Sequence, residues 1–183
     1  MIATDLRGPD ALAADFRQRL TNALLSDVVD RIAARRDLWE PLVSTVLGDR
    51  VGERTWARLP VREDLDVFVV TWRTSSRTSL HSHGGAASAF RTVEGVLTEI
   101  RPDTRGRLIP SNFAPGLTAL IAADEVHDLR NERGQRAVSV HAYAPGLTSI
   151  TYVDIIDGVA RPIRTTYPGT SALDPHWPRA TRP

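Results

Sequence analysis

The spacing of hydrophobic residues changes once along the chain, near residue 50. Before that point, apolar residues recur mostly at four-residue steps, as on one face of a helix: Leu12, Phe16, Leu20, Leu24, Val28 and Ile32. Asp37 and Glu40 fit the capping box of a second, shorter helix, with Pro41 in its first turn and its end near Gly48. The pattern predicts an N-terminal helical segment over residues 1–48 that packs against the rest of the domain.

Beyond about Arg50, short runs rich in Val, Ile, Thr and aromatic residues are separated by Gly, Pro, Asp and Asn, which is typical of strands. The expected strands are Thr55–Leu59, Asp66–Trp72, Thr78–His83, Ala86–Val93, Leu97–Arg101, Thr118–Ala122, Glu125–Leu129, Ala137–Tyr143, Ile150–Ile156 and Arg161–Thr165. Glu94-Gly95 has the composition of a tight hairpin turn. Many short strands without helices between them predict an antiparallel β-sandwich or β-barrel.

We therefore expect a single, mainly β domain over residues 1–183, with the barrel over residues 50–166. Residues 167–183 are rich in Pro, Gly, Ser and Thr, so we expect an irregular tail, in which His176 takes no part in function. No apolar run is long enough to span a membrane, and the N-terminus does not resemble a signal peptide. These features predict a cytoplasmic protein.

Composition limits the possible chemistry. The chain has no cysteine, which excludes disulfides, a thiolate nucleophile, iron–sulfur clusters and cysteine-ligated zinc. Its net charge of +1 gives no general reason to expect nucleic acid or an anionic membrane as a partner. A metal site must therefore be built from carboxylates and the five histidines.

Three of these histidines have the spacing of a metal site. His81 and His83 are two apart in an expected strand, so both side chains point to the same face. His127 lies on a separate strand and can approach them from across a barrel. Three neutral imidazoles suit Fe, Zn, Cu or Ni and leave positions open for a substrate. The alternative is that His81 and His83 are two polar residues on a surface strand.

The surroundings of these histidines resemble the two cupin motifs. The first motif has His-x-His, then Glu, then Gly, and Gly95 fits its last position. The second has Pro-x-Gly before its His and an Asn four residues after it, which His127 and Asn131 match. Ala122 and Asp124 replace the Pro and Gly. The resemblance implies a jelly-roll barrel with N-terminal α-helices.

The glutamate ligand of the first cupin motif is missing, because its place is taken by Ala86, Ala87 and Ser88. A three-His cupin without this Glu resembles the thiol dioxygenases, above all cysteine dioxygenase, from Trp56 to Ile156. That family binds Fe(II) through three His, chelates a thiol and adds both atoms of O₂ to its sulfur. Animal members have at the position of Ser88 a Cys that crosslinks to the active-site Tyr, so here the tyrosine is expected to stay a free phenol, as in bacterial members.

Ser139, His141 and Tyr143 match the family's Ser-x-His-x-Tyr motif, in which the His orients a Tyr that faces the bound substrate. Strand alternation places all three on one face, where a hydrogen-bonded relay can form. The alternative is a buried polar trio that satisfies its own hydrogen bonds. The family continues with Ser-Pro-Pro, whereas this chain has Ala144-Pro145-Gly146, so a turn is still expected.

Trp56-Ala57-Arg58 aligns with the family's Tyr-x-Arg, whose Arg binds the carboxylate of cysteine. A guanidinium suits a carboxylate because it can donate two parallel hydrogen bonds. Arg58 is therefore the predicted substrate-binding residue. Three other arginines are alternatives for this part: Arg73, Arg77 and Arg91. Asp128 and Asn131 are candidate supports behind the metal ligands, or else surface residues.

The resemblance implies oxidation of L-cysteine by O₂ to cysteine sulfinic acid at a three-His Fe(II) centre, by a monomer whose partners are a small thiol and O₂. A dioxygenase acting on 3-mercaptopropionate or another small thiol is the nearest alternative. A non-catalytic cupin that binds a metal or ligand is an alternative of another class. A cupin isomerase or epimerase using Zn or Ni is disfavoured by the missing Glu and by the Ser-x-His-x-Tyr motif.

Overall fold

A long helix precedes the strands in this computed structural model, which describes residues 9–47 and 54–167. Helix α1 spans Pro9–Ala34, α2 spans Arg36–Pro41, and a π-helical turn, η1, spans Leu42–Leu47. The tail predicted from residue 167 onward, with His176, lies outside the described residues apart from Tyr167. The N-terminal helical segment is confirmed where it is described.

The strands follow the predicted runs closely. They are β1 (Arg54–Leu59), β2 (Asp66–Trp72), β3 (His81–Ser82), β4 (Ala87–Glu94), β5 (Leu97–Pro102), β6 (Leu108–Phe113), β7 (Thr118–Ile121), β8 (Asp128–Arg130), β9 (Ala137–Ala144), β10 (Ile150–Ile156) and β11 (Val159–Thr166). Strand β6 was not predicted, because Pro110, Ser111 and Asn112 interrupt the β-favouring pattern. It lies at the edge of its sheet, where a proline is tolerated.

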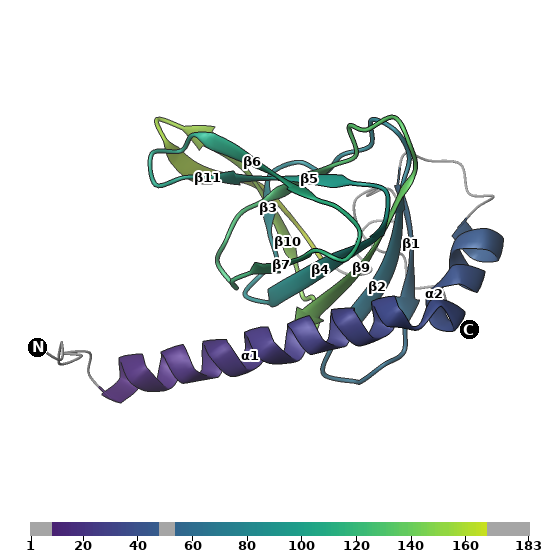
Figure 1. The fold of residues 1–183 in the computed structure, drawn as a ribbon. Helices are drawn as coiled ribbons and strands as arrows, with labels where there is room; N and C mark the ends of the chain where they lie inside the picture. The colour runs from purple at the N-terminus through teal and green to yellow at the C-terminus, as the bar shows by residue number, and fades with distance from the viewer. Residues whose placement is uncertain (1–8, 48–53, 168–183) are drawn as a thin grey trace, which may run out of the picture.

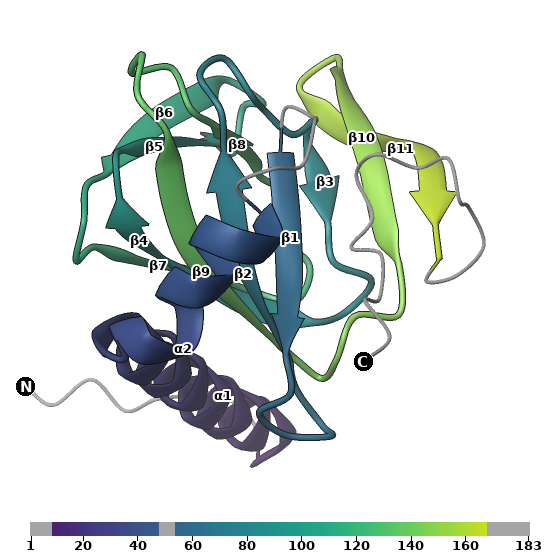
Figure 2. The same ribbon diagram turned by 90° about the vertical axis from the view of Figure 1, so that its right-hand side faces the viewer.

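The strands form two opposed antiparallel layers. One layer is a five-stranded sheet in the order β1-β2-β9-β4-β7. The other consists of two three-stranded sheets, β11-β10-β3 and β6-β5-β8, which are joined by isolated bridges at Arg77↔Arg130 and His81↔His127. Among the described residues no strand pairing links the two layers, so hydrogen bonds do not close the barrel. Figure 2 shows both three-stranded sheets with the five-stranded sheet.

The five-stranded sheet is covered on both faces, which explains why β2 and β9 are buried along most of their length. Its inner face contributes Phe68, Trp72 and Phe90 to the core between the layers. Helix α1 packs Leu25 and Val29 on its outer face, and Figure 1 shows the helix lying along this face. The core between the layers is therefore the place where polar side chains can be held away from water.

Three local predictions were wrong. Asp37 does not cap α2: the cap position is Arg35, without a side-chain cap, and Asp37 pairs with its guanidinium instead. Only the C-terminal part of the apolar face of α1 packs against the sheet. The N-terminal part of the helix extends beyond the sheet and leaves Phe16 and Leu20 exposed. Gly95 forms a turn with φ +70, but not a hairpin, because β4 and β5 pair with other strands.

Candidate metal centre

The backbone of the second layer brings the three predicted histidines together. His81 begins β3, and its N–H and C=O exchange hydrogen bonds with those of His127, just before β8. His83 follows the end of β3 and precedes Gly84, which has φ +60. A Cβ on Gly84 would overlap the Ser149 hydroxyl, so only glycine fits this turn. His81, His83 and His127 thus lie together in one group.

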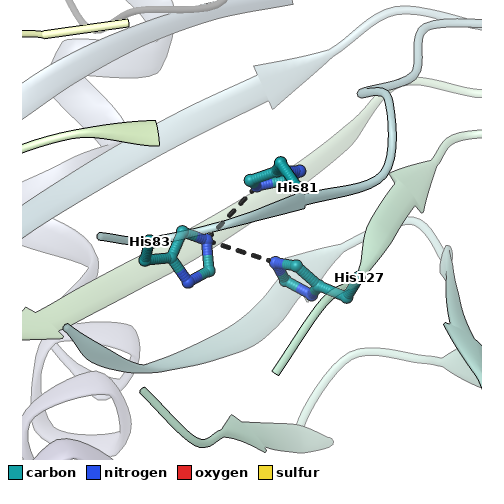
Figure 3. Close-up of side chains that lie close together, drawn as sticks. All are labelled: His81, His83 and His127. Carbon is teal, nitrogen blue, oxygen red and sulfur yellow. Dashed lines mark hydrogen bonds between the residues drawn. The ribbon is translucent and has the colours of Figure 1, made fainter. Parts of the chain in front are cut away.

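The imidazoles converge through one nitrogen each. The Nε2 of His83 lies 3.2 Å from the Nε2 of His81 and 3.3 Å from the Nε2 of His127, as Figure 3 shows. All three side chains are buried, and their ligand atoms lie within 4.8 Å of one another. Within the described residues no other such group of histidines and carboxylates occurs.

The outward-facing nitrogens are held by the protein. His81 Nδ1 lies 2.8 Å from the Ser79 carbonyl oxygen, and His127 Nδ1 lies 2.7 Å from Glu99 Oε1. A carbonyl and a carboxylate only accept hydrogen bonds, so both Nδ1 atoms carry the proton. The Nε2 atoms of these two residues point toward the Nε2 of His83. A cation between them would satisfy both lone pairs, and for this reason the residues fit a metal ion.

His83 completes the same arrangement. Its Nδ1 lies 3.2 Å from the Ser88 hydroxyl. Burial, followed by the nearby His81 and His127, lowers the pKa of His83 well below its ordinary value. The imidazole is thus neutral at physiological pH, which is the form that ligates a metal.

A series of hydrogen bonds leads from Trp72 on β2 to Ser139 and His141 on β9. The Trp72 indole N–H donates to the Ser139 hydroxyl at 2.8 Å, and that hydroxyl lies 2.8 Å from His141 Nε2. An indole N–H can only donate, so Ser139 accepts from Trp72 and keeps its own proton and a second lone pair for His141. Burial lowers the pKa of His141 to about 3, so the ring is uncharged.

Tyr143 lies between the hydrogen-bonded residues Ser139 and His141 and the three-histidine centre. Its ring centroid lies 5.0 Å from that of His83 and 6.4 Å from that of His141. Its hydroxyl has no hydrogen-bond partner among the described residues, and Tyr143 lines the cavity beside the centre. Burial raises the pKa of the phenol above its ordinary value, so it stays protonated and can donate to a ligand. The adjoining Ala144–Pro145 bond is cis.

The cavity opens between the two layers. It is lined by Arg54, Trp56, Phe68, Val70, Trp72, Thr78, His81, His127, Leu129, His141, Tyr143, Leu147, Ile150 and Tyr152. Mostly apolar and aromatic walls with a few converging polar groups are typical of a small-molecule site. His81, His127 and Tyr143 therefore face one space that a ligand can enter, and the His83 ring lies 5.0 Å from the ring of Tyr143.

The predicted substrate-binding arginine is not in this cavity. Arg58 is 49% exposed in its side chain and forms an ion pair with Asp66, at 2.6 Å. Arg54, four residues earlier in β1, lines the cavity instead. Its guanidinium stacks on the rings of Trp56 and Trp72, with centroid distances of 5.4 and 5.3 Å. Sequence alignment by the Trp-x-Arg pattern missed Arg54, because strand register decides which arginine enters the cavity.

The predicted support residues have other tasks. Asp128 accepts from Thr78 and Arg130, while Asn131 donates to the carbonyl oxygens of Trp72 and Gln135 and so braces the loops at the ends of β2 and β8. Both are buried, so neither is a surface residue. The carboxylate that contacts a metal-site histidine is Glu99. It is 28 positions from His127, and no motif in the sequence marks it as a candidate.

Comparison with known proteins gives a family for this arrangement. The family model described as cysteine dioxygenase type I matches residues 49–155. This range includes all three histidines and the Ser139–Tyr143 motif. No curated protein is significantly similar to the chain in sequence.

Solved structures agree on the fold. An uncharacterised protein with a double-stranded β-helix domain from Klebsiella pneumoniae is 17% identical, with a TM-score of 0.50, over 57% of this chain and 88% of that one. An oxalate oxidase in complex with the substrate analogue glycolate is 16% identical, with a TM-score of 0.48. The match covers 57% of each chain, so this chain spans little more than half of the oxidase. The Klebsiella structure and the observed strands confirm a mainly β fold of the double-stranded β-helix type, preceded here by an N-terminal helix. No described helix is long and apolar enough to cross a membrane.

Proposed function

Because the chain belongs to the cysteine dioxygenase type I family, we propose that it is a metal-dependent thiol dioxygenase that converts L-cysteine to cysteine sulfinic acid. The proposed cofactor is one Fe(II), held by His81, His83 and His127, and the proposed partners are the thiol and O₂, with no nucleic acid or membrane. The observation that carries the proposal is the convergence of three buried imidazole Nε2 atoms beside a cavity that also contains Tyr143.

The proposed reaction is balanced without a further reductant. The S–H bond of the thiol and the O–O bond of O₂ break, two S–O bonds form, and the proton passes to solvent or to the sulfinate. Sulfur gives up four electrons and O₂ accepts four. When bound, Fe(II) supplies the redox chemistry between the thiolate and O₂. The chain itself supplies binding, orientation and protection from water.

Arg54 is the residue we propose for the carboxylate of the substrate. Its guanidinium lines the cavity, and the Trp56 and Trp72 rings hold its plane in place from the side. A guanidinium held in this way loses little freedom when it donates two parallel hydrogen bonds to a carboxylate. Arg54 thus takes the role that the Trp-x-Arg pattern assigns to Arg58.

Tyr143 is the proposed hydrogen-bond donor to the reacting sulfur and oxygen atoms. Its phenol is protonated, faces the cavity and stands beside the His83 ring. Ser139 and His141 support Tyr143. The Ser139 hydroxyl hydrogen-bonds to the His141 ring, and this ring stacks near the ring of Tyr143. The apolar walls formed by Phe68, Val70 and Leu147 limit water at the site.

The experiment is reconstitution with Fe(II) under nitrogen, followed by oxygen uptake with L-cysteine, 3-mercaptopropionate and cysteamine, and mass analysis of the products under ¹⁸O₂. We expect stoichiometric uptake with L-cysteine and two labelled oxygen atoms in the product. Faster turnover of 3-mercaptopropionate would retain the dioxygenase and reassign its substrate. Iron binding without uptake with any thiol would replace the enzyme by a metal-binding cupin.

A further inference from the structure

A buried carboxylate stands directly behind one of the three metal-site histidines. Glu99 on β5 is 2% exposed, and its Oε1 lies 2.7 Å from the Nδ1 of His127. This oxygen is on the side of the ring opposite Nε2, so Glu99 is not a fourth ligand. In the equivalent place the Nδ1 of His81 contacts the Ser79 carbonyl oxygen, and the Nδ1 of His83 contacts the Ser88 hydroxyl. The three imidazoles therefore differ in what supports them.

The carboxylate is kept charged by a second contact. Arg101 Nε lies 3.0 Å from Glu99 Oε2, and Arg101 Nη1 lies 3.0 Å from Glu125 Oε2. Arg101 also donates to the Leu120 carbonyl, which fixes the guanidinium across neighbouring strands. A buried carboxylate is costly unless it is paired. These contacts offset that cost, and Glu99 Oε1 accepts both from Arg101 Nη2 at 3.1 Å and from His127 Nδ1 at the shorter distance of 2.7 Å.

We propose that Glu99 is the positioning residue of the metal centre, which locks His127 with Nε2 toward the metal and makes it the strongest donor of the three imidazoles. The inference rests on the proposed function, because it assumes that the three histidines hold a metal ion. A hydrogen bond from Nδ1–H to a carboxylate fixes the tautomer and increases the electron density at Nε2. The charge that most cupins place in the ligand shell as Glu lies here one residue further out, behind a histidine.

Two consequences separate this role from simple packing. Loss of the charge at Glu99 weakens metal binding, and it also withdraws electron density from the metal, which raises the midpoint potential of the Fe(III)/Fe(II) couple. A residue that only fills space changes stability but neither of these properties. Glu99→Gln retains the shape of the side chain and removes its charge.

Asp128 provides a matched control. It is a buried carboxylate of the same layer that pairs with an arginine, Arg130, but it contacts none of the metal-site histidines. Asp128 follows His127 in the chain, so Asp128→Asn removes a similar buried charge equally near the centre without removing a hydrogen bond to a metal-site histidine. If potential and affinity depend only on the general field of buried charges, the two variants will behave alike.

The experiment titrates Co(II), as a spectroscopic probe, into the metal-free protein and measures affinity and the visible d–d bands. The midpoint potential of the Fe-loaded protein is measured alongside. We expect Glu99→Gln to bind Co(II) roughly 10- to 100-fold more weakly, with shifted bands and a more positive iron potential. Asp128→Asn should match the wild type in all three.

The outcomes distinguish the two proposals. If the wild-type chain does not bind Co(II) with one-to-one stoichiometry, the three-His centre itself is wrong. If it does bind, and Glu99→Gln has unchanged affinity, bands and potential, Glu99 has no positioning role. Should Glu99→Gln fail to fold, ¹⁵N NMR of the wild-type Zn(II) form decides: a His127 Nδ1 without a strongly deshielded proton overturns the inference.

Discussion

The Trp72 indole N–H lies 2.8 Å from the Ser139 hydroxyl, which lies 2.8 Å from His141 Nε2. Trp72 can only donate, so Ser139 accepts from it and connects it to His141. A residue on β2 is thereby linked by hydrogen bonds to the ring that supports Tyr143.

Replacing Trp72 with Phe should reduce kcat more than it changes KM, because Ser139 and His141 lose the indole donor while Phe keeps an aromatic ring beside Arg54. The unpaired buried group should also cost about 1–3 kcal/mol of stability. Trp39→Phe is the matched control: Trp39 is equally buried and donates to the Ala33 carbonyl, but on the far side of the sheet. Steady-state kinetics and urea unfolding measure both variants, and equal losses of kcat would refute the role of Trp72.

Arg54→Ala and Arg58→Ala form a pair within one strand. A lost charged hydrogen bond of about 1.5–3 kcal/mol predicts that Arg54→Ala raises KM for L-cysteine by roughly 10- to 100-fold. Arg58→Ala should leave KM unchanged and cost at most about 1 kcal/mol of stability, since it removes a half-exposed ion pair. A KM increase in Arg58→Ala alone would restore the prediction made from the Trp-x-Arg pattern.

His83→Ala should abolish metal binding, because the remaining two Nε2 atoms lose the third ligand. At a metal concentration of about 100 times Kd, Co(II) should stabilise the wild type by about 2.7 kcal/mol and the variant not at all. Urea unfolding with and without Co(II) measures the difference. Stabilisation of the variant by an equal amount would mean that the metal binds elsewhere.

Tyr143→Phe should retain metal affinity and lower kcat, because it removes only the hydroxyl that faces the cavity. The raised pKa of the phenol predicts that this hydroxyl stays protonated throughout the physiological range. Ultraviolet titration of the wild type and Tyr143→Phe should accordingly show no ionisation of this tyrosine near its ordinary pKa. A phenolate signal at or below that value, absent in the variant, would contradict the assignment.

Stability of the metal-free protein should fall as the pH drops below about 6.5. The pKa of His141 is lowered to about 3, so between these values the unfolded chain binds a proton that the native chain does not. This group contributes a slope of up to about 1.4 kcal/mol per pH unit, with its full contribution to stability present above pH 6.5. His141→Gln should reduce that slope in urea unfolding measured from pH 7.5 to 4.5, and an unchanged slope would count against this pKa.

The sequence alone determined the features that depend on local periodicity and on residue type. Alternation along β9 placed Ser139, His141 and Tyr143 on one face, and the His-x-His spacing paired His81 with His83. The absence of cysteine left histidines and carboxylates as the possible metal ligands. The mainly β class and most strand positions followed from the same alternation. These features depend on neighbours within a few residues, so the chain order is sufficient to find them.

Tertiary structure alone decided what depends on register and on distant contacts. The pairing of β1 with β2 and the aromatic stack on Trp72 bring Arg54 into the cavity and leave Arg58 with Asp66, although both have the same strand parity. The pairing of β5 with β8 places Glu99 behind His127, and the pairing of β2 with β9 places Trp72 beside Ser139. Sequence separations of 28 and 67 residues carry no local signal of such contacts, because loop closure and sheet packing set them.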